Sequence, residues 1–167
     1  HYFLIHKGYD LHRDEYLHLD QAKHLAWGYD SVPPVTSWIS FIILKLGNGI
    51  FWVKFFPALF GALTIVMVWK IIEALGGNLF AMIAGSVAVL VSAILRINIL
   101  YQPSSLEIFC WTAFYYTFVR YIISAENKWL YITAIIIAVG FLNKYNINGI
   151  TKVCTGVLLT LRRAFYF

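Results

Sequence analysis

One long polar stretch interrupts a chain that otherwise consists of apolar runs, and this contrast limits the folds open to it. The stretch is Arg13 to Pro34, RDEYLHLDQAKHLAWGYDSVPP, and it holds four of the eight acidic residues. Overall, 60% of the residues are hydrophobic and 13% are charged, whereas about a quarter are charged in a soluble domain. Because backbone groups inside lipid must be satisfied within the chain, only helices and closed barrels span a bilayer. The apolar runs therefore predict an all-α, polytopic transmembrane helical bundle, with the polar stretch outside the bilayer.

The length bounds the number of crossings. With 167 residues and about 20 for each spanning helix, five or six crossings fit at most beside the polar stretch. The first residues, His1 to His6, are apolar but lack the basic start and cleavage site of a signal peptide. We expect residues 1–7 to be the outer end of a helix whose beginning is missing, 8–49 to be an extracytoplasmic loop, and 50–161 to form about five membrane helices. Such a fragment is expected to be inactive alone.

The loop is expected to contain two interfacial helices. Asp14 to Trp27 has good helix formers and an apolar side, but it is too short and too charged to span. Gly28 and the pair Pro33-Pro34 then break the helix. Val35 to Leu46 is apolar but about half the length of a crossing, and Gly47 follows it closely.

Counting the later helices predicts which polar residues share a side of the membrane. The expected helices are Ile50–Leu75, Leu79–Leu100, Leu106–Ser124, Trp129–Leu142 and a short last one, Ile150–Leu161. If the first four cross in alternate directions, four polar residues face the same side, namely Asp14, Glu15, Glu107 and Lys144. A true crossing by Val35–Leu46 would remove this convergence.

The positive-inside rule argues against placing these acids outside the cytoplasm. Five of the thirteen Lys and Arg lie on the opposite side, and eight lie on the acid-bearing side; the five are Lys70, Arg120, Lys128, Arg162 and Arg163. We give this count less weight because the orienting first helix is missing. Basic residues that hold a phosphate would also raise the count on the working side.

Several other classes of site are disfavoured. Cys110 and Cys154 lie in apolar segments without metal-type spacing. The five histidines fall within the first 24 residues, and those in the loop are spaced by six, which does not place ligand pairs on one helical face. The net charge of +5 comes from positive residues scattered singly, without the basic stripe of a nucleic-acid-binding protein. An anionic lipid is the better partner.

Three polar features could carry chemistry, and each has a structural alternative. The pair Asp14-Glu15 could provide a catalytic base or simply begin a helix, where carboxylates are favoured. Glu107 lies at the edge of an apolar helix, where an acid is either functional or a solvated helix-start residue. Lys144, which precedes Tyr145, could bind phosphate or snorkel to the interface beside an aromatic residue.

The ordered set of motifs resembles the N-terminal part of a GT-C glycosyltransferase of the dolichyl-phosphate-mannose protein mannosyltransferase type. That group includes the bacterial lipid A aminoarabinose transferases. The features that carry the resemblance are RDE at residues 13–15, HLAWGY at 24–29, Pro33-Pro34, QPSSLEIFCWTAFYYTFVRYI at 102–122 and FLNKY at 141–145.

The resemblance implies an enzyme that moves a sugar from a polyprenyl-phosphate carrier to an acceptor hydroxyl, with inversion. It implies that Asp14 acts as the base with Glu15 beside it. It also implies that substrate is contacted by Glu107, Lys144, Tyr145 and Arg13. The resemblance implies no cofactor beyond the lipid-linked donor, and it does not exclude a divalent metal. The implied partners are membrane lipid and an acceptor protein, lipid or glycan. The expected location is a bacterial inner membrane, with the active site facing the periplasm.

A non-enzymatic lipid-binding or transport protein is the alternative. In such a protein, acids and bases at the membrane edge line a pathway, and half-helices broken near the midplane are expected.

Overall fold

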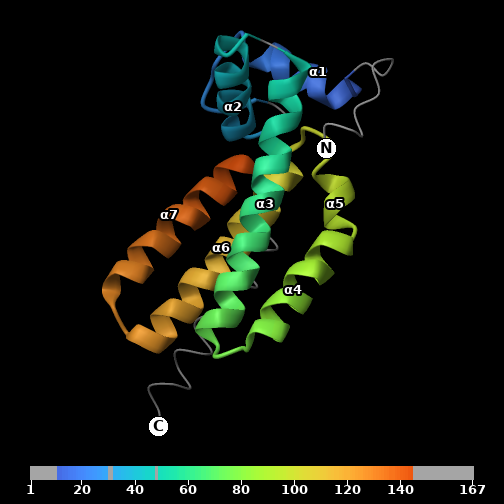
Figure 1. Ribbon diagram of the computed structural model, residues 1–167. Coiled ribbons are helices and arrows are strands. Elements are labelled where there is room, and N and C mark those ends of the chain that lie inside the picture. The colour runs from blue at the N-terminus through green and yellow to red at the C-terminus, as the bar shows by residue number, and fades with distance from the viewer. Residues whose placement is uncertain (1–10, 30–31, 48, 145–167) are drawn as a thin grey trace.

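A computed structural model describes residues 11–29, 32–47 and 49–144, and the regular structure in these ranges is entirely helical (Figure 1). This confirms the predicted all-α fold. The helices are α1 (Arg13–Gln21), α2 (Pro34–Lys45), α3 (Ile50–Ala74), α4 (Leu79–Val91), α5 (Ile94–Ile97), α6 (Pro103–Ser124) and α7 (Asn127–Asn143). The helix end predicted at residues 1–7 and the predicted last helix, Ile150–Leu161, lie outside the described residues.

The longest helix, α3, is the centre of the bundle and packs against both α4 and α6, while α7 packs on the other side of α6. Its 25 residues extend for about 37 Å at ~1.5 Å per residue, which exceeds the hydrocarbon thickness of about 30 Å. Within the described ranges, it is the one helix both long and apolar enough to cross a membrane, and α2, α4 and α7 are shorter apolar helices.

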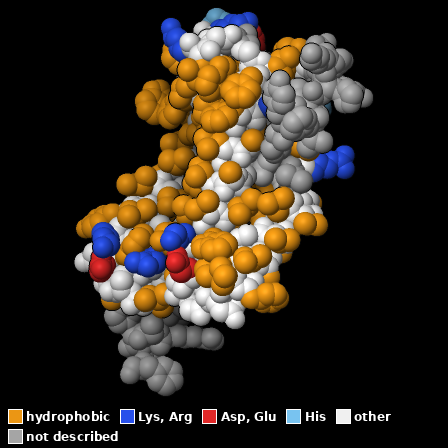
Figure 2. Space-filling view, viewed as in Figure 1, with side chains coloured by type: hydrophobic (Ala, Val, Ile, Leu, Met, Phe, Trp, Pro, Cys, Tyr) orange, Lys and Arg blue, Asp and Glu red, His pale blue; other side chains and the backbone are white. Residues whose placement is uncertain are grey.

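The outer surface of the bundle is strongly hydrophobic. Figure 2 shows hydrophobic side chains over most of the described surface between the α1–α2 end and a group of charged side chains near the other end. Phe80 and Val91 of α4 are each 79% exposed, and none of the residues of α4 is buried. Exposed apolar area of this extent is typical of a surface that meets lipid.

The predicted helix Leu79–Leu100 is wrong as one continuous helix, because the chain breaks at Ser92. The backbone of Ser92 is extended, and its Oγ donates to the carbonyl of Val89 at 2.7 Å and accepts from the N–H of Ile94 at 3.3 Å. These bonds satisfy the backbone groups that the break releases. The short α5 follows, and buried Asn98 then packs over Gly61 of α3.

The helix predicted over Asp14–Trp27 is also shorter than expected, since α1 ends at Gln21. The hydroxyl of Tyr29 lies 2.9 Å from the carbonyl oxygen of Gln21 and 2.8 Å from that of His24, and it accepts the N–H of Ala26 at 3.2 Å. The Tyr29 hydroxyl thus takes the place of the backbone hydrogen bonds that a further helical turn after Gln21 would make. The chain therefore turns back toward α2.

The helix predicted over Val35–Leu46 is observed as α2, whose 12 residues extend for about 18 Å. It lies beside α1 at one end of the bundle (Figure 1). Pro34 occupies its first turn, where a missing N–H is tolerated. A proline also begins α6 at Pro103, three residues before the predicted start at Leu106, so Glu107 lies in the second turn of that helix.

Candidate active site

The structure brings the polar residues of interest together at the α1–α2 end of the bundle (Figure 1). Asp14 and Glu15 lie in the first turn of α1, Glu107 lies near the start of α6, and Lys144 caps the end of α7. This is the grouping that counting helices predicts. The contacts of each residue decide what it can do.

The first turn of α1 is fixed by a capping box. The N–H of His12 donates to Glu15 Oε2 at 2.8 Å, and the N–H of Asp14 donates to His12 Nδ1 at 3.4 Å. These bonds satisfy backbone donors at the helix start. The structural alternative for the acid pair therefore applies to Glu15, whose carboxylate is part of the cap.

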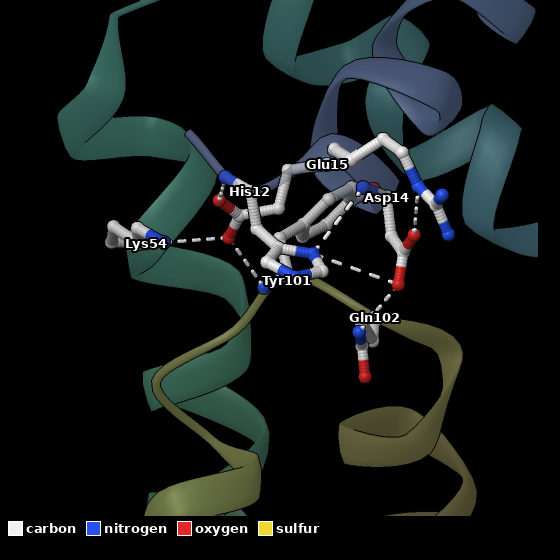
Figure 3. A network of polar contacts seen from close by, with 7 residues as sticks. His12, Asp14, Glu15, Lys54, Tyr101 and Gln102 are labelled. Atoms are coloured by element: carbon white, nitrogen blue, oxygen red, sulfur yellow. Dashed lines mark hydrogen bonds and ion pairs between the residues drawn. The ribbon is translucent and has the colours of Figure 1, made fainter. Parts of the chain in front are cut away.

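Glu15 is fully buried and has partners from three parts of the chain (Figure 3). Its Oε1 accepts from Lys54 Nζ of α3 at 2.6 Å and from the N–H of Tyr101 at 2.7 Å. Its Oε2 accepts the His12 N–H. Both oxygens are therefore engaged, and a carboxylate in this position is suited to holding elements together.

Asp14 is different, because its side chain is 35% exposed. Its Oδ2 accepts from Gln102 Nε2 at 3.0 Å and lies 3.6 Å from His12 Nδ1, while its Oδ1 lies 3.6 Å from Nε of Arg13 (Figure 3). The side chain of Arg13 is 93% exposed and is loosely held. Asp14 is thus oriented by a neutral amide, and it remains accessible to a ligand.

Glu107 and Lys144 form an ion pair between α6 and α7, with Nζ to Oε2 at 2.9 Å. The Lys144 side chain is 49% exposed and that of Glu107 is 15% exposed. A small pocket between the two helices opens beside the pair, and apart from these two residues its lining is mainly apolar, namely Cys110, Trp111, Phe114, Ile136, Ile137, Gly140 and Phe141. An accessible cation therefore lies at the edge of an apolar site.

The residue before Lys144 fixes the end of α7. Asn143 is fully buried, its Oδ1 accepts from Thr36 Oγ1 at 3.1 Å, and its Nδ2 donates to the carbonyl of Pro103 at 2.7 Å. One side chain therefore connects α7 to both α2 and the start of α6. Sequence reasoning missed this residue, although an amide at the end of an apolar run was a usable signal.

Tyr101 continues the same polar layer inward. Its hydroxyl lies 2.9 Å from Ser40 Oγ and donates to the carbonyl of Thr36 at 2.9 Å. Burial raises the pKa of Tyr101, so its hydroxyl stays protonated and remains a donor. Sequence reasoning also missed Gln102 and Tyr101, and it assigned no partner to Lys54.

Two predictions remain, a substrate contact by Tyr145 and the question of a divalent metal. Tyr145 lies outside the described residues. Across the ranges that the structure describes, no group of three or more His, Cys, Asp or Glu side chains could hold a metal ion.

A profile of the dolichyl-phosphate-mannose-protein mannosyltransferase family matches residues 31–164. The match covers Lys54, Glu107 and Lys144, and it begins after Asp14 and Glu15. Neither a curated protein nor a solved structure matches the chain. Because the family match extends over most of the chain, this protein belongs to the dolichyl-phosphate-mannose-protein mannosyltransferase family, whose members are integral membrane glycosyltransferases.

Proposed function

We propose that the protein transfers a sugar from a polyprenyl-phosphate donor to an acceptor hydroxyl, with inversion at the sugar carbon. One observation carries the proposal: an accessible carboxylate, Asp14, and an accessible amine, Lys144, both reach the start of α6. Asp14 binds Gln102 just before that helix, and Lys144 binds Glu107 in its second turn. Pro103, the residue after Gln102, lies about 6 Å from Glu107 along the helix axis, at ~1.5 Å per residue.

Asp14 is the proposed base. A carboxylate that removes the proton of the acceptor hydroxyl must be oriented and reachable, and the bond from Gln102 together with the 35% exposure satisfies both conditions. Glu15 has the same chemistry, but its oxygens are buried and engaged. The acceptor oxygen would attack the sugar from the face opposite the phosphate, which gives inversion.

Lys144 is the proposed phosphate contact. A polyprenyl phosphate leaves with negative charge on oxygen, and a nearby ammonium stabilises that charge in the transition state. An ammonium has three N–H donors, and the bond to Glu107 uses one of them. Glu107 thereby holds the amine at the edge of the pocket while the exposed part of Lys144 remains open to an anion.

The active site is proposed to face the periplasm of a bacterial inner membrane. In this orientation the donor enters from the lipid, which agrees with the exposed apolar surface around the bundle. The acceptor hydroxyl, whether on protein, lipid or glycan, would approach from the side of α1 and α2.

The transport alternative has one supporting feature, the break between α4 and α5. The polar group at this break is the hydroxyl of Ser92, and its hydrogen bonds are made to the neighbouring backbone. The acids and amines of the candidate site instead gather at one end of the bundle, which favours chemistry at the interface over a pathway through the membrane.

The test uses membranes that carry the full-length protein and radiolabelled polyprenyl-phosphate sugars. Asp14→Asn is expected to reduce transfer by about 10² to 10⁴, the usual contribution of a general base. Asp20→Asn is the matched control, since Asp20 lies in the same helix, is exposed, and pairs with Lys23. Normal transfer by Asp14→Asn would refute Asp14 as the base, and movement of intact donor between leaflets without transfer would favour transport.

A further inference from the structure

We propose that Lys54 and Glu15 form a buried positioning pair that holds Asp14 in its catalytic orientation. This inference rests on the proposed role of Asp14 as the base. It assigns to Lys54, a residue within an apolar helix, a role in turnover rather than in anchoring α3 at the interface. Neither Lys54 nor Glu15 is proposed to touch substrate.

The contacts of Glu15 define the pair. Its carboxylate receives one bond each from the start of α1, from α3 and from the segment before α6, through His12, Lys54 and Tyr101. All three bonds are between 2.6 and 2.8 Å. Three elements that are distant in sequence therefore meet at one fully buried side chain.

Two parallel connections then join α1 to the start of α6. Glu15 binds the N–H of Tyr101, and the adjacent residue Asp14 binds the side chain of the next residue, Gln102 (Figure 3). A change in the position of Glu15 therefore moves Asp14, which is the adjacent residue of α1. It also moves the segment that carries Gln102, the partner of Asp14. Asp14 and Gln102 keep their register only while Glu15 stays in place.

Lys54 is what allows Glu15 to stay in place. A buried carboxylate without a counter-charge is strongly disfavoured, and removing one partner of a buried ion pair leaves the other uncompensated. The Lys54 side chain is 16% exposed and lies next to Val53, which is fully buried. The amine is thus held on α3 at the site where Glu15 needs it.

A second ion pair on α3 provides the comparison. Lys70 and Glu73 are 2.7 Å apart, but their side chains are 48% and 52% exposed. Exposed pairs of this kind contribute little. Loss of Lys70 should therefore leave Asp14 undisturbed, which makes Lys70→Met a matched control for Lys54→Met.

The first experiment measures sugar transfer by the full-length protein in membranes, normalised to the amount of folded protein. Lys54→Met is expected to lower kcat by about 10²-fold, the scale of loss that a displacement of about 1 Å produces in a catalytic group. The KM for the donor should change little, because Lys54 pairs with Glu15, whereas the proposed phosphate contact, Lys144, pairs with Glu107. Lys54→Arg should recover most of the turnover, and Lys70→Met should keep all of it.

The second experiment separates positioning from a general loss of structure. If Lys54 acts through Asp14, Lys54→Met should cause little further loss once Asp14→Asn is present, since the effects of residues that act as a unit are not additive. Glu15→Gln keeps the shape of the side chain while removing its charge, and it serves if Lys54→Met does not fold. Glu15→Gln is expected to lower kcat with the donor KM unchanged.

The outcomes distinguish this inference from the proposed function. Normal turnover of Asp14→Asn refutes the proposed function itself. Impaired Asp14→Asn together with normal turnover of Lys54→Met or Glu15→Gln overturns the positioning pair alone. A loss that multiplies in full with that of Asp14→Asn also overturns it, because Lys54 would then act independently of the base.

Discussion

Replacement of Asn143 tests whether the end of α7 is held by a buried amide. Asn143→Ala removes two hydrogen bonds, to Thr36 Oγ1 and to the carbonyl of Pro103. A hydrogen bond contributes about 0.5–1.5 kcal/mol, and a buried polar group left unpaired costs about 1–3 kcal/mol. Because Thr36 is 3% exposed and the bond to Pro103 is partly buried, we expect a loss of about 2–4 kcal/mol in the free energy of unfolding.

The assay is reversible denaturant unfolding of the detergent-solubilised protein. Asn127→Ala is the control, since Asn127 begins the same helix and is exposed, and its effect should stay within about 0.5 kcal/mol. Asn143→Asp adds a second comparison, because an ionised aspartate can accept from Thr36 but cannot donate to Pro103. It should therefore be destabilised too. Equal stability of the Asn143→Ala and Asn127→Ala proteins would refute the proposed connection.

Two further predictions concern a charge and a pH dependence. Lys144→Ala should reduce kcat/KM for the donor by about 10- to 100-fold, the effect of losing a charged hydrogen bond of about 1.5–3 kcal/mol. The control Lys45→Ala, which removes an exposed lysine of α2, should leave kcat/KM unchanged. Unchanged donor dependence of Lys144→Ala would exclude the phosphate role. Burial lowers the pKa of His18, so the unfolded chain binds the proton more readily. Stability from this group is complete above about pH 6.5 and is lost as the pH falls through the lower folded-state pKa. Unfolding titrations from pH 8 to pH 5 should show this slope, His18→Gln should reduce it, and an unchanged slope would contradict the assignment.

The family match and the geometry contribute different parts of this account. The match covers residues 31–164, so it identifies the class of protein while leaving Asp14 and Glu15 outside its range. The role of Asp14 therefore rests on its exposure and on its bond to Gln102. This is why the Asp14→Asn measurement matters more to the mechanism than any further comparison of sequences.

Hydropathy predicted the all-α bundle, and the same-end grouping of Asp14, Glu107 and Lys144 needed only a count of helices. The places where helices end were harder, because they depend on side chains several residues away. Tyr29 ends α1 early through carbonyls of the preceding segment, and Ser92 interrupts α4 through its neighbours. Neither residue type stops a helix by itself.

The distinction between Asp14 and Glu15 could not be predicted from the sequence. The two are adjacent and chemically equivalent, and what separates them is a lysine 39 positions away and a backbone N–H 86 positions away. The partner of Lys54 is Glu15, and it becomes visible only once α1 packs against α3. Long-range polar contacts of this kind leave no local periodic signal.

The sidedness of the two ends of the site tests the central claim most directly. Arg13→Cys and Lys144→Cys, each placed in a protein without Cys110 and Cys154, would be exposed to a membrane-impermeant maleimide on intact spheroplasts, with Lys70→Cys as the opposite-end control. Positions 13 and 144 are both expected to be labelled from outside, and position 70 is expected to be protected. Labelling of only one of positions 13 and 144 would contradict an active site that surrounds a single lipid phosphate.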